Sequence, residues 1–185
     1  MKKRILFTVF ILLQLGYFTC GILYHKGKIE KGRKIILKVK PRDPYSPVRG
    51  RYLHVTYTIS DLPSRLLEGE KRGIQRGEEV FVVLEKKGDV WEARKIVKEK
   101  PESGVFIKGK VKYSWQGKIH LEYGIEGIFM DEDRCEKLNA LLSSGFRRGQ
   151  RPSYFYVEVS VDKEGRACPT GIIVKGESYS VMPFH

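Results

Sequence analysis

The chain has 185 residues, of which 41% are hydrophobic and 31% are charged, and its formal net charge is +13 at pH 7. A substantial core is therefore expected beneath a heavily charged surface. The sequence argues against nucleic acid as a partner, because basic residues alternate with glutamates and no zinc-finger or helix–turn–helix pattern is present. A basic body close to a bilayer suggests attraction to anionic lipid headgroups or to acidic polymers of a cell envelope; the more common explanation of such a charge is a solvated basic surface without a ligand.

The amino terminus contains an uncharged run over residues 5–24, directly after the basic residues 2–4. A helix of this length rises about 30 Å, which matches the hydrocarbon core of a bilayer. The end of the run is bulky and lacks the small residues that precede a signal-peptide cleavage site. We therefore predict a retained, single-pass membrane anchor over residues 1–25, with cleavage or acylation of Cys20 as the alternatives.

The orientation of this anchor depends on the basic residues on its two sides. The cluster at residues 2–4 favours a cytoplasmic N-terminus, whereas further basic residues between 26 and 34 favour the opposite. Because the first cluster lies directly against the apolar run, we predict a cell-membrane protein whose body, residues 26–185, is extracytoplasmic. The body is long enough for one domain, or for two packed halves that divide near residues 100–105.

Alternation of apolar and polar residues predicts a mainly β (α+β) body with antiparallel strands. Strands are expected over residues 35–40, 52–59, 80–84, 90–96, 107–115, 119–123, 155–161 and 171–174. In the fifth of these, the alternation predicts one core-facing row, which is Ile107, Gly109, Val111, Tyr113 and Trp115. A turn at Gln116-Gly117 then predicts a hairpin with the next strand.

One or two short helices are expected in the body. A short one is predicted from Ser60 to about Leu67, and a longer one over residues 132–144, where the preceding acidic residue can serve as the N-cap. Cys135 and Cys168 are the body's two cysteines, and they can form a disulfide only in an oxidising compartment.

Groups able to perform catalysis or bind a metal are sparse. His120 and Glu122 share one face of their predicted strand, so together with His54 they are the best candidates for metal ligands. His120, Glu122 and Glu126 are the candidate catalytic groups of an envelope hydrolase. Ser46 and Ser64 lie on predicted loops or turns without a nucleophile-elbow pattern, so a serine nucleophile has little support. We predict no metal and no cofactor, and a non-catalytic protein, with the hydrolase as the alternative.

The most unusual sequence lies between residues 41 and 57. It contains Pro41-Arg42-Asp43-Pro44 and then Gly50-Arg51-Tyr52-Leu53-His54-Val55-Thr56-Tyr57, which resembles the motif of the GDYXXLXY family of bacterial proteins. The resemblance continues at Tyr123-Gly124-Ile125-Glu126 and over residues 157–166. Arg51 replaces the aspartate of the motif and Val55 replaces its leucine, so the motif is expected to be mainly structural. The resemblance implies a family with no established activity.

The sequence thus predicts a membrane-anchored protein whose extracytoplasmic domain binds a membrane-protein partner or a cell-envelope component. The partners considered are a multi-pass membrane protein met through the anchor, anionic lipid, and an envelope polymer. The binding residues are expected in the proline-rich loop, the strand after it and the turn at residue 126, and they are Arg42, Asp43, Arg49, Gly50, Arg51, Tyr52, His54 and Glu126.

Overall fold

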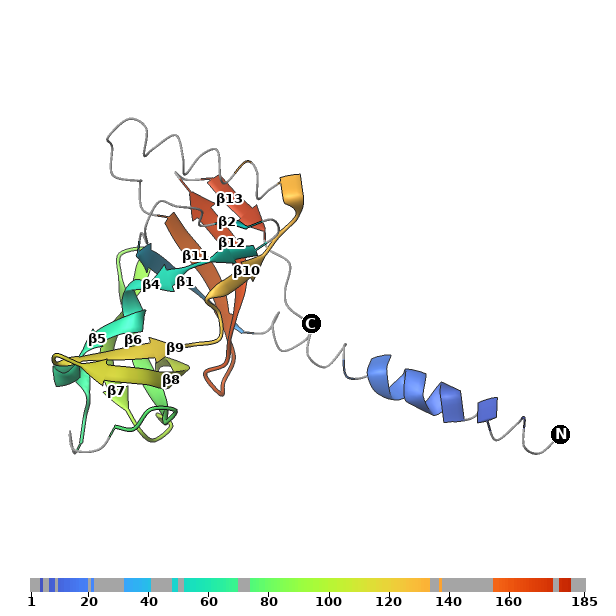
Figure 1. The fold of residues 1–185 in the computed structure, drawn as a ribbon, viewed down its shortest axis with the longest axis horizontal. Helices are drawn as coiled ribbons and strands as arrows, with labels where there is room; N and C mark the ends of the chain where they lie inside the picture. Colours follow the sequence, from blue (N-terminus) through green and yellow to red (C-terminus); the bar gives the residue numbers. More distant parts are fainter. Residues whose placement is uncertain are drawn as a thin grey trace.

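The computed structural model describes residues 4, 7–8, 10–19, 21, 32–40, 48–49, 52–69, 74–133, 137, 155–174 and 177–180. Beyond residue 31, these residues form three sheets in which neighbouring strands are antiparallel (Figure 1). The mainly β, antiparallel class that the alternation predicted is confirmed.

The first sheet joins the two ends of the body in the order β13-β12-β11-β1-β4. Its strands are β1 (Arg33–Lys40), β4 (Thr56–Tyr57), β11 (Phe155–Val161), β12 (Ala167–Val174) and β13 (Glu177–Ser180). Strand β11 is its centre, between β12 and β1, and β1 in turn pairs with β4 at its end. The buried face of β1 carries Ile35, Leu37 and Val39, as its alternation predicted.

The second sheet comes from the middle of the chain, in the order β5-β9-β8-β6-β7. Its strands are β5 (Asp61–Pro63), β6 (Glu79–Lys87), β7 (Val90–Val97), β8 (Val105–Trp115) and β9 (Lys118–Glu122). A parallel bridge between Leu67, just beyond β5, and Ile96 of β7 brings the two edges together, so the sheet is a nearly closed barrel.

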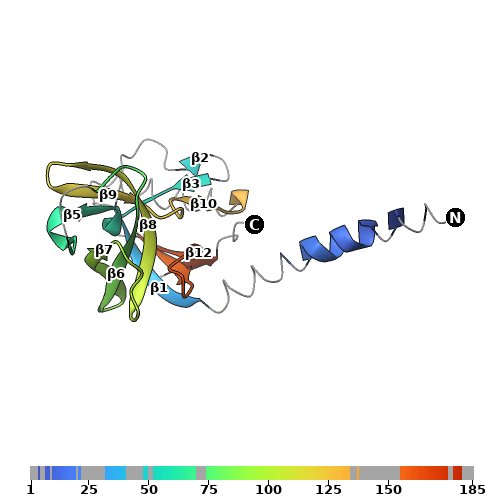
Figure 2. The same ribbon diagram turned by 90° about the horizontal axis from the view of Figure 1, so that it is seen from below.

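A small third sheet lies beside the first, and one hydrophobic core connects all of them (Figure 2). It consists of β10 (Gly127–Phe129), β3 (Tyr52–His54) and β2 (Val48–Arg49). Leu53 of β3 and Ile128 of β10 are cross-strand partners and are both fully buried.

The segment after β3 differs from the single strand predicted over residues 52–59. Val55 leaves the strand pairing and donates its backbone N–H to the Glu126 carbonyl, at 2.8 Å, and the chain then enters a 3-10 turn, η1 (Thr58–Ser60). The predicted core face is nevertheless confirmed, since Leu53, Val55, Tyr57 and Ile59 are all buried.

The short helix predicted from Ser60 to about Leu67 is wrong. Residues 61–63 instead form β5, which pairs with β9, and only a second 3-10 turn, η2 (Ser64–Leu66), follows. The local capping signals at Ser60 and Asp61 are outweighed by backbone pairing with a distant strand. Strand β13 was not predicted, because its sequence, Glu-Ser-Tyr-Ser, has no apolar alternation.

Residues 10–19 are helical, and Figure 1 shows them apart from the strands. Among the described residues, no helix combines the length and the apolar character needed to cross a membrane. In the longer predicted helix, Glu132, Asp133 and Lys137 are helical, while the rest of residues 132–144, Cys135 included, lies outside the described residues.

Candidate functional site

The candidate site is the outward-facing side of the β8–β9 hairpin, which we call the hairpin face. The row predicted for β8 is correct up to Val111, which pairs with Leu121 in the core. The register then shifts by one residue, so that Tyr113 pairs with His120 and Trp115 with Lys118. This bulge at Lys112 reverses the direction of the following side chains. The prediction that Tyr113 and Trp115 face the core is therefore wrong.

Both aromatic side chains reach solvent. Trp115 is 71% exposed and Tyr113 is 50% exposed. The ring of Tyr113 lies flat on the His120 imidazole, with the ring centroids 4.7 Å apart and the ring planes within 5° of each other. One face of the tyrosine ring is therefore covered by protein, and its exposed surface is the opposite face.

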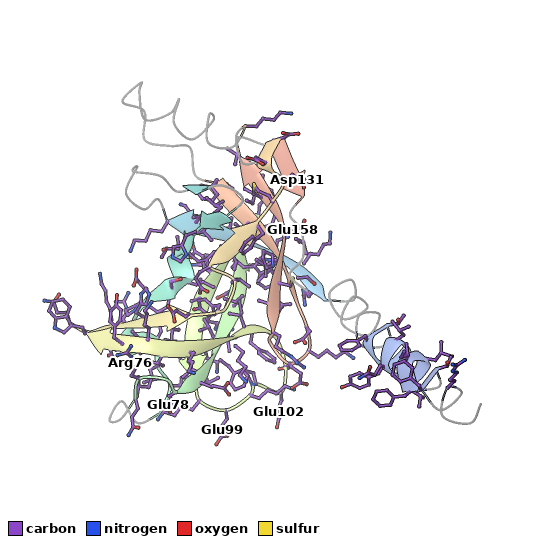
Figure 3. The ribbon with its side chains drawn as sticks, turned by 45° about the vertical axis from the view of Figure 1, so that its right-hand side comes forward. Arg76, Glu78, Glu99, Glu102, Asp131 and Glu158 are labelled. Atoms are coloured by element: carbon purple, nitrogen blue, oxygen red, sulfur yellow. The ribbon has the colours of Figure 1, made fainter. Side chains whose placement is uncertain are left out.

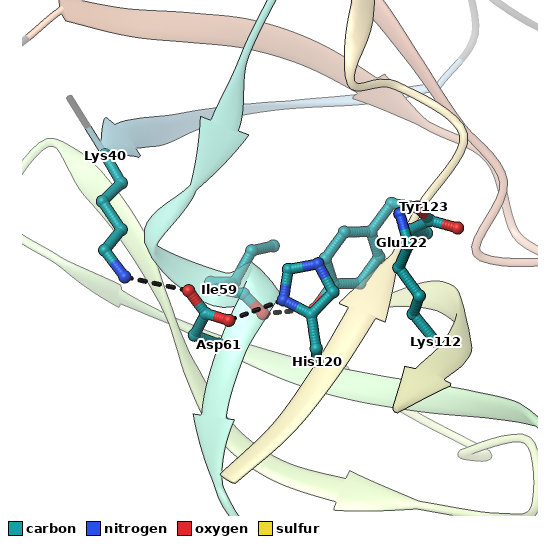
Figure 4. A network of polar contacts seen from close by, with 7 residues as sticks. All are labelled: Lys40, Ile59, Asp61, Lys112, His120, Glu122 and Tyr123. Carbon is teal, nitrogen blue, oxygen red and sulfur yellow. Dashed lines mark hydrogen bonds and ion pairs between the residues drawn. The ribbon is translucent and has the colours of Figure 1, made fainter. Parts of the chain in front are cut away.

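A polar network holds His120 in place beneath this ring (Figure 4). Its Nδ1 lies 2.6 Å from Oδ1 of Asp61, and the other oxygen of Asp61 accepts a hydrogen bond from Lys40 Nζ at 2.9 Å. Burial opposes ionisation of Asp61, but the hydrogen bonds from Lys40 and His120 outweigh it and hold the pKa of this carboxyl below its ordinary value. The network links β1, β5 and β9 behind the exposed ring.

Lysines surround the aromatic pair. Lys108 pairs with Glu79 at 2.8 Å, and Lys112 pairs with Glu122. Among the described residues, no carboxylate lies within ion-pair distance of Lys110 or Lys118. Lys118 lies directly across the hairpin from Trp115. In register, Lys110 lies between Glu79 of β6 and Glu122 of β9, each of which pairs with another lysine, whereas Lys118 faces Trp115. Among the described residues, the hairpin face thus presents four lysines and two glutamates next to two exposed aromatic rings.

Of the predicted binding residues, Glu126 has the clearest structural role. Its Oε1 accepts the backbone N–H of Tyr123 at 2.6 Å, and its own carbonyl accepts the N–H of Val55. The buried hydroxyls of Tyr57 and Tyr123 donate to the carbonyls of Ile125 and Ile59, at 2.7 and 2.6 Å. Burial, and then the charge of Glu126, raise the pKa of both tyrosines well above its ordinary value.

The other predicted binding residues come from the proline-rich loop and β3. His54 is exposed and pairs in register with Gly127, so it lies next to Glu126. The backbones of Arg49 and Tyr52 pair with each other. The remaining four, Arg42, Asp43, Gly50 and Arg51, lie outside the described residues. The described half of the family motif therefore builds the core through Leu53, Val55 and Tyr57.

The groups considered for metal binding or hydrolysis do not converge. His120 and Glu122 share the outward side of β9, but His120 is paired with Asp61 and Glu122 with Lys112. The described residues contain no group of three histidine, cysteine or acidic side chains that could hold a metal. A surface cavity of about 450 Å³ lies between residues 100–106 and 161–163, and neither histidines nor Glu126 line it. Figure 3 shows labelled acidic residues such as Glu78, Glu99 and Glu158 distributed around the body.

Tyr113 and Trp115 were missed as site residues although the sequence contains a signal for them. Counting backwards from the two-residue turn at Gln116-Gly117 pairs Trp115 with Lys118 and Tyr113 with His120, which places both with polar partners. Counting forwards from Ile107 in steps of two residues instead places Tyr113 and Trp115 on the core side of the strand. The conflict between the two counts indicates a bulge in the strand.

A family model described as GDYXXLXY protein matches residues 14–172, which is most of the chain. No curated protein and no solved structure matches it. The chain belongs to the GDYXXLXY family.

Proposed function

We propose that this member of the GDYXXLXY family is a non-catalytic binding protein, tethered to the cell membrane by its N-terminal segment, whose β-rich body binds a component of the cell envelope. The observation that carries the proposal is the hairpin face, where Tyr113 and Trp115 are exposed beside Lys110 and Lys118, which form no ion pair with a described carboxylate. Exposed aromatic and basic side chains on a rigid sheet are typical of recognition surfaces.

The state of the titratable groups supports binding over catalysis. A general base or nucleophile needs a free position next to the reacting atom. The carboxylate of Asp61 is bound by Lys40 and His120, that of Glu122 by Lys112, and that of Glu126 by a backbone N–H. Asp61 and Glu122 thereby hold neighbouring strands, and Glu126 holds the turn that follows β9.

The proposed tether is the uncharged run at residues 5–24, whose described residues 10–19 are helical. The same segment offers a second candidate partner, a multi-pass membrane protein, because its apolar side chains are exposed; Phe10, Leu12, Leu13 and Phe18 are among them. Within a bilayer, helices associate through side-chain packing, close approach at small residues and interhelical hydrogen bonds.

Two assays on the full-length chain separate these candidates. In the first, the chain in nanodiscs is mixed with insoluble cell-wall material of the native cell and sedimented; binding that falls with salt supports the envelope ligand. In the second, membranes are crosslinked before purification, and capture of a multi-pass protein supports the second candidate. A chain that stays in the supernatant and is recovered alone after crosslinking contradicts the proposal.

The proposed orientation has its own test. A reporter enzyme that is active only outside the cytoplasm is fused after His185, and a second fusion carries a reporter active only inside. Activity of the first fusion supports an extracytoplasmic body. Activity of the second alone, with both fusions present at equal levels, places the body inside and contradicts envelope binding.

A further inference from the structure

We propose that the hairpin face binds an acidic polysaccharide, with Tyr113 and Trp115 stacking on sugar rings and Lys110 and Lys118 binding the acidic groups of the polymer. This inference rests on the proposed function and names the class of envelope component. Its basis is the combination of outward aromatic rings and, among the described residues, an excess of lysines over carboxylates on one side of one hairpin.

The aromatic pair fits the flat, weakly polar face of a sugar ring. The exposed face of Tyr113 is kept parallel to the His120 imidazole, so little rotational freedom is lost when a ligand ring covers it. Trp115 follows two residues later on the same side of the strand, at a separation of about 6.6 Å along β8. Two consecutive rings of an extended chain can therefore lie on the two side chains.

The support beneath Tyr113 is unusually rigid for a surface residue. His120 is only 18% exposed and is held by Asp61, which is itself held by Lys40. The turn that ends the hairpin is tight, since Gln116 and Gly117 both have positive φ, 48° and 73°, as a type I′ turn requires. The rings are thus positioned before a ligand arrives, which reduces the entropic cost of binding.

Charge favours an acidic polymer over a neutral one. Among the described residues of the hairpin face, the lysines at 108, 110, 112 and 118 outnumber Glu79 and Glu122, so the face carries an excess of positive charge. Lys118 is directly opposite Trp115, so an acidic group on a stacked sugar would lie within reach of its ammonium group. Such contacts are strengthened by charge and weakened by salt.

Position favours a polymer over the lipid surface. Figures 1 and 2 show the tip of the β8–β9 hairpin and the N-terminal helix at opposite ends of the molecule. A surface that recognised lipid headgroups would be expected near the proposed tether. The tip of the hairpin instead lies at the far end of the body from this helix, where material more distant from the membrane would be met.

The test uses the full chain in nanodiscs of zwitterionic lipid, titrated with polygalacturonate as the acidic polysaccharide. Dextran, which is neutral, and polyglutamate, which is acidic but contains no sugar, are the comparison polymers. Binding is followed by fluorescence; the chain has two tryptophans, and Trp91 is 9% exposed, so the response reports mainly on Trp115. We expect binding of polygalacturonate that is at least tenfold tighter than that of polyglutamate, and no binding of dextran.

Four variants assign the binding to the hairpin face, with bead-immobilised polymer as a readout that needs no tryptophan. Trp115→Ala is expected to weaken binding at least tenfold, and Trp115→Phe less, because a ring remains. Lys118→Gln is expected to weaken it severalfold and to reduce its salt dependence. Lys86→Gln is the matched control: Lys86 is exposed on β6, next to Trp91 at the other end of the barrel, and its loss should change binding little.

Four results would overturn the inference. Equal binding of polygalacturonate and polyglutamate, insensitive to Trp115→Ala, means simple charge attraction. Binding of phosphatidylglycerol vesicles that depends on Trp115, without binding of polygalacturonate, assigns the face to lipid. If Trp115→Ala sediments with cell-wall material as well as the wild type does, the proposed function stands but the hairpin face is not its binding site. If the wild type itself does not sediment, both the envelope ligand and the binding role of the hairpin face are contradicted.

Discussion

Two aromatic pairs in this molecule have opposite environments. Tyr57 and Tyr123 are buried between the sheets, and each donates its hydroxyl to a backbone carbonyl. Tyr113 and Trp115 lie on the outside of the barrel, and a strand bulge turns them towards solvent. The first pair includes the last residue of the family motif, Tyr57, so the motif specifies how the sheets meet. The second pair lies outside it and is available for a ligand.

The comparison shows that an aromatic residue in an alternating strand has no fixed role until its register is known. Tyr123 packs so closely against Gly109 that a Cβ on this glycine would approach the tyrosine ring to 2.9 Å. Four residues further along β8, the same alternation leads to Tyr113, whose ring is half exposed. One extra residue of β8, Lys112, lies between Gly109 and Tyr113. It is the reason why Tyr113 faces the surface, whereas Tyr123 packs against Gly109 in the core.

The largest effect should follow removal of a buried tyrosine. Tyr57→Ala deletes a fully buried ring and its hydrogen bond to Ile125, so we expect the free energy of unfolding to fall by about 3–5 kcal/mol. Tyr113→Ala, on the surface, should cost about 1 kcal/mol or less. Denaturant unfolding of both variants measures the difference, and equal losses would break the distinction between the two pairs.

A smaller effect should come from the hydroxyl alone. Tyr123→Phe leaves the Ile59 carbonyl without its donor in a buried position, at an expected cost of about 1–3 kcal/mol. Tyr113→Phe is the matched surface control and should change stability by less than about 0.5 kcal/mol. Thermal unfolding of the two variants at one pH is sufficient; a Tyr123→Phe protein as stable as the wild type would contradict the buried hydrogen bond.

Asp61 connects the two regions, and its contribution should depend on pH. Because its folded-state pKa is depressed, ionised Asp61 stabilises the fold above its unfolded pKa of about 3.9, and this stabilisation is lost as pH falls through the folded value. Asp61→Asn should therefore cost about 1 kcal/mol at pH 7, and the difference from the wild type should shrink below pH 4. Glu99→Gln, on an exposed loop, is the control; a pH-independent cost of Asp61→Asn would contradict the ion-pair interpretation.

The bulge itself can be tested by deleting Lys112. Without this residue Val111 can still pair with Leu121 and Tyr113 with His120 in an uninterrupted ladder, so both aromatic rings should keep their outward direction. The lost Lys112–Glu122 pair is exposed and is worth at most about 1 kcal/mol. Acrylamide quenching of Trp115 should be unchanged, whereas a marked change in quenching would show that the register differs from the one described.

Most strands could be predicted from the sequence because period-two alternation is a local signal, as in Ile35, Leu37 and Val39 of β1. Features that depend on partners far away in the sequence could not be predicted in this way. Strand β5 exists because Asp61 pairs with His120, 59 residues away, and nothing in the sequence around Ser60 indicates this. Similarly, the shared face of His120 and Glu122 followed from their spacing, but the partners that occupy both side chains did not.

The smallest expected effect is that of Trp115→Ala on stability, and Trp91→Ala is its buried counterpart. Trp91 is nearly buried and lies beneath the Arg33 guanidinium, with 5.3 Å between Cζ and the ring centroid, so Trp91→Ala should cost about 3–5 kcal/mol. Trp115 has 71% of its surface in solvent, and Trp115→Ala should change the free energy of unfolding by less than about 0.5 kcal/mol. Denaturant unfolding measures both. A Trp115→Ala variant that unfolds as readily as Trp91→Ala would make Trp115 part of the core, whereas a fully stable variant leaves its exposed ring without a folding role and favours recognition as the reason for its position.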